Sequence, residues 1–177
     1  MIFRGQPQQV TVWRRFRSGR DGFTFNETVD GLFEAHLAAN AERAVDLMYV
    51  LSEHLPPAVD VALTDRRTQA SWLGTDVALP DVRDAIARLK IPLATYAGVD
   101  ITVYTADDQL SLTAALDLYA IGRSDRWLYL LQSRGLERYA AVAEKAWRGQ
   151  PWDKSPAMVL STVLAATADR LSLAEVE

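Results

Sequence analysis

The chain's only two histidines, His36 and His54, are the side chains best suited to general-base catalysis or metal binding near neutral pH. They lie eighteen residues apart, and no metal-ligand spacing accompanies either of them. We therefore expect structural roles, with His36 as a partly buried helix residue and His54 at a helix C-terminus, where positive charge is favoured. The chain has no cysteine, which excludes thiolate nucleophiles, disulfides and cysteine-ligated metals. The sequence thus predicts no metal, no other cofactor and no histidine-dependent chemistry.

Neighbouring carboxylates occur twice, as Asp107-Asp108 and as the pair Asp81 and Asp84. Acid–base chemistry of the glycosidase type needs two carboxyl groups that face one cleft from separate elements. Adjacent aspartates usually form a turn, because their side chains bond nearby backbone amides, and acidic residues after Pro80 suit the first turn of a helix. The sequence contains no phosphate-binding loop, dinucleotide fingerprint or Gly-x-Ser-x-Gly elbow. We therefore favour a protein without catalytic activity.

A basic segment opens the chain. Residues 1–20 carry five arginines and no acid, so with a net charge of −4 for the whole chain the remainder carries −9. The cluster Trp13, Arg14, Arg15, Phe16 and Arg17 combines guanidinium groups, which pair with carboxylates or phosphates, with aromatic rings that stack. Because the whole protein is acidic and would repel a polyanion, we expect the arm to contact an acidic surface of its own chain, a second subunit or another protein. Nucleic acid is the less favoured partner.

Five tryptophans are many for a chain of 177 residues. Tryptophan buries a large area and keeps one polar group, so it is favoured both in cores and in protein interfaces. Trp72 and Trp127 fall in segments that alternate like strands, and we expect both in the core. Trp147 and Trp152 flank the connector Gly149–Pro151 and are candidates for a binding surface, together with the cluster in the arm.

Apolar residues at helical spacing predict two helices before residue 56. Asn26 can cap the first helix, which would include Val29 and run to Leu37. Asn40 offers either a break or the cap of a second helix. Pro56-Pro57 ends that helix, because proline lacks the amide hydrogen and clashes with the preceding turn.

The next segment alternates apolar and polar residues. It predicts a hairpin with strands over residues 59–63 and 68–72. Pro80 is well placed as the first residue of a third helix, and Pro92 limits its end. Residues 93–96 are expected to form a short strand.

The stretch from Val99 to Leu131 predicts antiparallel strands. Residues 99–103 form one strand, and Asp107-Asp108 turns the chain. Residues 110–120 carry apolar side chains at even positions and predict one bent strand or two strands, with a helix as the competing interpretation. The last strand is expected at residues 126–131.

Two further helices are expected near the end of the chain. The first runs from Leu136 to Trp147. Ser155-Pro156 begins the second, which reaches about Leu171. Its residues are apolar nearly all round, so it needs cover on more than one side.

Together these elements predict an α+β protein, with an antiparallel sheet of about five strands and helices packed on it. Residues 1–25 would form the basic arm and residues 26–177 a single α+β domain. The order of elements (helix, hairpin, helix, hairpins, helix) is similar to that of small dimeric binding modules such as type III secretion chaperones. That similarity implies a dimeric, chaperone-like role.

Two classes of function remain. The first is a non-catalytic protein-binding or adaptor module that forms a homodimer through its C-terminal helix, where Ala165, Ala166 and Ala168 allow close approach. The alternative is a small-ligand-binding protein or enzyme, with a pocket between sheet and helices. No apolar run has the length of a membrane span and no secretion signal is visible, so we expect a cytoplasmic protein.

Overall fold

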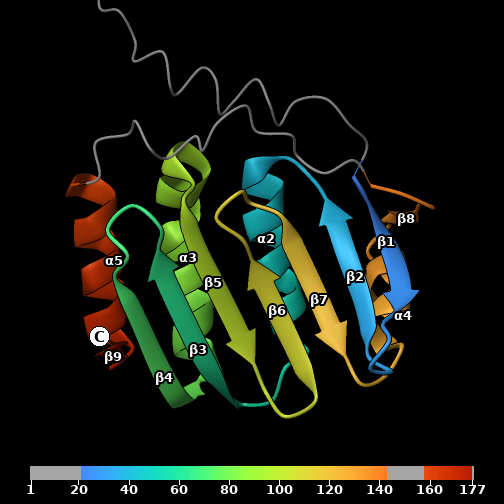
Figure 1. Cartoon of the computed structure of the whole chain (residues 1–177), viewed down its shortest axis with the longest axis horizontal. Helices are drawn as coiled ribbons and strands as arrows, with labels where there is room; N and C mark the ends of the chain where they lie inside the picture. The colour runs from blue at the N-terminus through green and yellow to red at the C-terminus, as the bar shows by residue number, and fades with distance from the viewer. Residues whose placement is uncertain (1–20, 143–157, 177) are drawn as a thin grey trace, which may run out of the picture.

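A mostly antiparallel sheet of nine strands is the centre of the computed structural model, which describes residues 21–142 and 158–176 (Figure 1). The strands are β1 (Gly22–Glu27), β2 (Phe33–Ala38), β3 (Ala58–Asp65), β4 (Ser71–Ala78), β5 (Val99–Tyr104), β6 (Asp108–Leu112), β7 (Leu118–Gly122), β8 (Glu137–Arg138) and β9 (Ala174–Val176). They lie in the order β8-β1-β2-β7-β6-β5-β3-β4-β9, and only the pair β1 and β8 is parallel. The chain is an α+β protein, as predicted, but its sheet is larger than the five strands expected.

Helices cover one face of this sheet, behind the strands in Figure 1. They are α2 (Ala41–Ser52), α3 (Leu79–Tyr96), α4 (Arg126–Ser133) and α5 (Met158–Arg170). Alternate residues of the central strands are buried, such as Leu63 of β3 and Val103 of β5. Their neighbours in the same strands, Thr64 and Thr102, are partly exposed. This alternation is typical of a sheet with one covered face. No helix of the described residues covers the other face, which we call the open face.

Several elements follow the sequence prediction. Asn40 caps α2, and its side chain accepts a hydrogen bond of 2.9 Å from the amide of Arg43. The hairpin is formed by β3 and β4, and α3 carries Pro80 in its first turn. Residues 108–122 form the two strands β6 and β7 rather than a helix. Leu116, which lies between these strands, has a positive φ of 64°, and a right-handed α-helix does not contain this conformation.

The helix predicted from Asn26 to Leu37 is wrong, because this segment is the hairpin of β1 and β2. Phe23, Phe25, Ala35 and Leu37 are buried at alternate positions, which is the period of a strand. Val29, which fitted the helical spacing, is fully exposed in the turn. Strand β1 also includes residues 22–25, the last part of the expected arm.

The strand predicted at residues 126–131 is also wrong, because these residues belong to the helix α4. Trp127 and Leu131, one helical turn apart, are fully buried, whereas Tyr129 between them is exposed. Trp127 is therefore a core residue, as expected, although a helix and not a strand places it there. Its indole Nε1 donates a hydrogen bond of 3.2 Å to the carbonyl of Ile121.

Two other boundaries differ from the prediction. Helix α3 runs through Pro92 to Tyr96, so the short strand expected at residues 93–96 is absent, and the helix ends where Ala97 adopts a positive φ. The helix expected from Leu136 does not begin there, because Glu137–Arg138 pairs with β1 as strand β8. The rest of that predicted helix, from residue 143, lies outside the described residues, as does the start predicted for the last helix.

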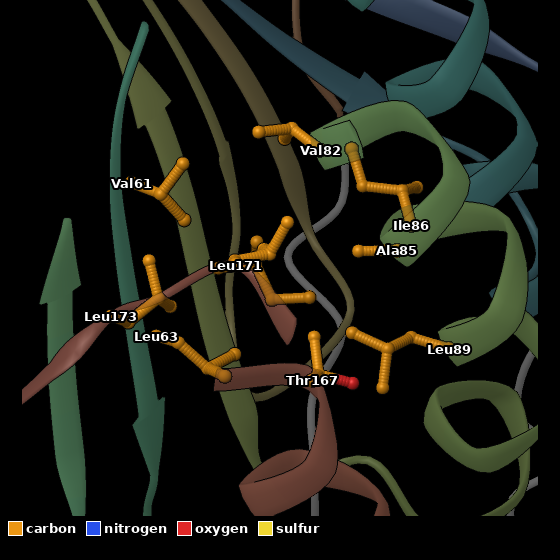
Figure 2. A pocket seen from close by; sticks show the side chains of 10 residues that line it. Val61, Leu63, Val82, Ala85, Ile86, Leu89, Thr167, Leu171 and Leu173 are labelled. Carbon is orange, nitrogen blue, oxygen red and sulfur yellow. The ribbon is translucent and has the colours of Figure 1, made fainter. Parts of the chain in front are cut away.

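The core between sheet and helices is tightly filled. Figure 2 shows Val61 and Leu63 of β3 facing Ile86 and Leu89 of α3, with Leu171 between them. The remaining space admits a water-sized sphere in a volume of only about 10 Å³. A single water needs about that much room and polar partners as well, so this apolar gap is not a ligand pocket.

Candidate functional site

The side chains that the sequence singled out for binding all lie outside the described residues. They are Trp13, Arg14, Arg15, Phe16, Arg17, Trp147 and Trp152. The described residues offer three other places where functional side chains could gather. These are the open face around His36, a cleft beside Glu53, and the outer side of α5.

His36 lies on the open face in β2, not on a helix, and its register partner is Tyr119 of β7. The two rings stack with centroids 4.5 Å apart and planes at 8°. Nε2 of His36 lies 3.3 Å from Oδ1 of Asp117, and both side chains are largely buried. A carboxylate can hold an imidazole in one orientation for base catalysis, but such a site also needs a nucleophile within hydrogen-bond reach. In the part of the chain that the structure describes, no hydroxyl bonds this ring.

Hydroxyl pairs continue this polar surface across the open face. Thr102 and Ser111 bond each other across β5 and β6 at 3.0 Å, and Thr64 and Ser71 do so across β3 and β4 at 3.1 Å. Gln109 also donates to Ser111 at 2.8 Å. These side chains bond one another, so they form a hydrogen-bonded polar surface on the open face.

Asp107 and Asp108 form the turn between β5 and β6, as predicted. Both of their amides donate to Oγ1 of Thr105. The carboxylate of Asp108 pairs with Arg126 at 2.8 Å, and that of Asp107 with Arg123 at 3.3 Å. Each carboxylate has its own cation, so the two do not act as an acid–base pair.

Asp81 and Asp84 lie at the start of α3, where the sequence placed them. The hydrogen bond from Arg88, opposed by desolvation and assisted by the charge of Arg170, lowers the pKa of Asp84. Arg170 lies 2.6 Å from this carboxylate, which joins α5 to α3. Asp84 is therefore an ionised structural residue and not a proton donor at neutral pH.

A cleft of about 360 Å³ separates α2 from the beginning of α3. Its lining residues are Tyr49, Glu53, Leu79, Pro80, Arg83, Asp84 and Ala87. Glu53 is the C-cap of α2 and accepts a hydrogen bond from Arg134. His54 follows it at the helix C-terminus, as predicted, and its Nε2 lies 3.4 Å from the Glu53 carboxylate. The cleft thus combines charged and apolar walls.

From Met158 to Ala168 the outer side of α5 is exposed and uncharged, and the charged residues Asp169 and Arg170 follow at its C-terminal end. Met158 and Val159 in its first described turn are 83% and 59% exposed, and Thr162, Ala165 and Ala166 continue the exposed side. Three residues on the inner side, Leu160, Leu164 and Ala168, are buried against the neighbouring elements. The sequence predicted that this helix needs cover on more than one side, and only its inner side is covered by described residues.

Comparison of the chain with protein-family models, with curated proteins and with solved structures found no match. No group of three acidic or histidine side chains in residues 21–142 and 158–176 could hold a metal ion. None of the helices described combines the length and the apolar character needed to cross a membrane.

Proposed function

We propose that this protein is a non-catalytic protein-binding module that forms a homodimer through the outer side of α5. One observation carries this proposal: from Met158 to Ala168 the helix has no charged residue, although its outer side is exposed. A solvated helix face normally carries charged or strongly polar residues. An uncharged exposed face is more typical of an interface between proteins.

A second copy of the chain is the partner that fits this face. A two-fold interface places the same patch on both subunits, so the patch must be complementary to itself. Between Met158 and Ala168 the face is neutral, so this part meets its copy without repulsion between like charges, and Ala165 and Ala166 allow two helices to approach closely. Two further apolar side chains, Leu73 of β4 and Val176 of β9, are exposed on the two strands that lie next to α5 in Figure 1.

The alternative function, a small ligand held between sheet and helices, has less support. The space between β3, α3 and α5 has room for about one water, and its lining is apolar apart from Thr167. A ligand pocket of that kind would need a cavity of several hundred Å³, roughly 300–1,000 Å³, with converging polar groups.

Sedimentation velocity at micromolar concentration tests the dimer. We expect the unmodified chain to sediment as a dimer, and Ala165→Arg to give a folded monomer, because the arginine places two like charges in a two-fold contact. Ala87→Arg is the matched control, since Ala87 is also an exposed alanine on a helix but lies on α3. A monomer for the unmodified chain, or a dimer that withstands Ala165→Arg, contradicts the proposal.

The proposed function includes a second contact, through the cluster of aromatic and arginine residues in the basic arm. Trp13, Arg14, Arg15, Phe16 and Arg17 carry three positive charges beside two aromatic rings, and the rest of the chain is acidic. We expect replacement of the three arginines by glutamine to weaken assembly or thermal stability. If both are unchanged while salt-sensitive binding to DNA or RNA is lost, the arm contacts nucleic acid instead.

A further inference from the structure

Arg83 is an arginine without a hydrogen-bond acceptor among the described residues. Its Nε is buried from solvent and has no partner. The carboxylate of Glu53 lies 3.9 Å from its Nη2, which is beyond hydrogen-bond distance. Buried donors in folded proteins are nearly always paired. The guanidinium is therefore short of an acceptor, although its side chain is only 28% exposed.

Tyr49 holds this guanidinium at the wall of the cleft between α2 and α3. The central carbon of the Arg83 guanidinium lies 4.5 Å from the centroid of the Tyr49 ring. Stacking of this kind orients the planar group before any ligand arrives, so little side-chain entropy is lost on binding.

The two carboxylates of the cleft already have cationic partners. Glu53 is bonded by Arg134, and Asp84 is bonded by Arg88 and paired with Arg170. Arg83 has an ion pair with Glu53 at 3.9 Å, but among the described residues it has no hydrogen bond to a carboxylate. Its Nη groups therefore have donors to offer to an acceptor in the cleft.

We infer that this cleft binds a small oxyanion, a carboxylate or a phosphate group, through the guanidinium of Arg83. The two Nη nitrogens of Arg83 can bond two oxygens of such a group at once, whereas the buried Nε lies out of its reach. Leu79, Pro80 and Ala87 supply an apolar wall on which the remainder of the ligand would pack. The cleft of about 360 Å³ is large enough for a ligand of a few carbon atoms. This site lies on other residues than the α5 face and does not depend on the dimer.

Titration of the full, ¹⁵N-labelled chain with sodium acetate and, separately, with inorganic phosphate tests the inference at constant ionic strength. We expect saturable amide shifts confined to the end of α2 and the first turns of α3, with at least one of the two anions. The anion that saturates identifies the group, carboxylate or phosphate. Arg83→Gln should abolish the saturable shifts. Arg123→Gln should leave them unchanged, because Arg123 is an exposed arginine outside the cleft.

Arg83→Lys provides a second variant if Arg83→Gln does not fold. It keeps the positive charge but loses the planar fork, so we expect the Kd to rise about tenfold, the effect of losing one charge-assisted hydrogen bond. The inference is overturned if neither anion gives saturable shifts with the unmodified chain. It is equally overturned if the shifts persist in Arg83→Gln, or if Arg83→Lys binds as tightly as the unmodified chain.

Discussion

Arg170 of α5 and Asp84 of α3 form an ion pair of 2.6 Å that ties the C-terminal end of α5 to its neighbouring helix. Asp84 also accepts a hydrogen bond of 2.8 Å from Arg88, one helical turn along α3. The other end of α5 exposes Met158. The helix is therefore held on its inner side and at its C-terminal end, which fixes the direction in which its outer side faces.

Asp84→Asn should lower the melting temperature at pH 7 slightly, because it removes the charge that both arginines bond. The pKa of Asp84 is lowered in the folded chain from an ordinary value of 3.8. Its contribution to stability is therefore complete above that value and is lost as the pH falls through the lower, folded pKa. We expect the difference between unmodified chain and variant to shrink below about pH 4. Thermal unfolding followed by circular dichroism at pH 7 and pH 3 measures this.

Asp30→Asn is the control for this experiment. Asp30 is exposed in the turn between β1 and β2, and the described residues give its carboxylate no ion pair. The variant should unfold like the unmodified chain at both pH values. An equal loss in both variants would mean that net charge, and not the contact with Arg88 and Arg170, sets the effect.

Trp127→Ala should destabilise the fold by about 3–5 kcal/mol, the usual cost of removing a large buried aromatic side chain. Trp127 is completely buried and bonds the carbonyl of Ile121. Trp127→Phe keeps most of the packing and should cost less, about 1–3 kcal/mol for the lost hydrogen bond. Urea unfolding measures both values. Tyr129→Ala on the same helix is the control, since that side chain is 61% exposed, and a similar loss there would contradict the assignment of Trp127 to the core.

Ser161→Ala should lower the free energy of unfolding by about 1 kcal/mol, the typical net value of one hydrogen bond. The Ser161 hydroxyl donates to Oδ2 of Asp65 at 3.3 Å, and Asp65 is completely buried at the end of β3. This bond ties α5 to the sheet. Thr162→Ala is the matched control, because the Thr162 hydroxyl bonds only the carbonyl of Met158 within its own helix. An equal effect of the two substitutions would show that the contact with Asp65 does not stabilise α5.

The sequence predicted correctly those elements whose apolar residues fit either the helical period or the strand period, but not both. The hairpin of β3 and β4 alternates cleanly, and α2 combines a helical stripe with the cap at Asn40. The segment around Trp127 contains apolar residues on every side, and such a short run fits a helix or a strand equally well. Tertiary packing decides there, because Trp127 and Leu131 reach the core only from a helix.

The candidate sites were harder to predict, because their partners are distant along the chain. His36 and Asp117 are 81 residues apart, and only the register of β2 with β7 brings them together. Arg83 stacks on Tyr49 across two helices whose relative position no sequence period encodes. Spacing of residue types can find a motif on one element, but it cannot find a site that folding assembles from several.

Gly31→Ala tests whether residues 26–37 belong to the hairpin of β1 and β2, where the apolar spacing predicted a helix. Gly31 has a positive φ of 76° in the turn, and no atom would obstruct an added Cβ. Alanine should therefore destabilise the chain by about 1–2 kcal/mol through backbone strain alone. Gly31→Asn should cost less, because asparagine tolerates this conformation. If residues 26–37 formed the helix that the apolar spacing predicted, alanine would instead stabilise the chain by about 1 kcal/mol. Urea unfolding of the two variants gives opposite signs for the two structures, and a stabilising Gly31→Ala would refute the hairpin.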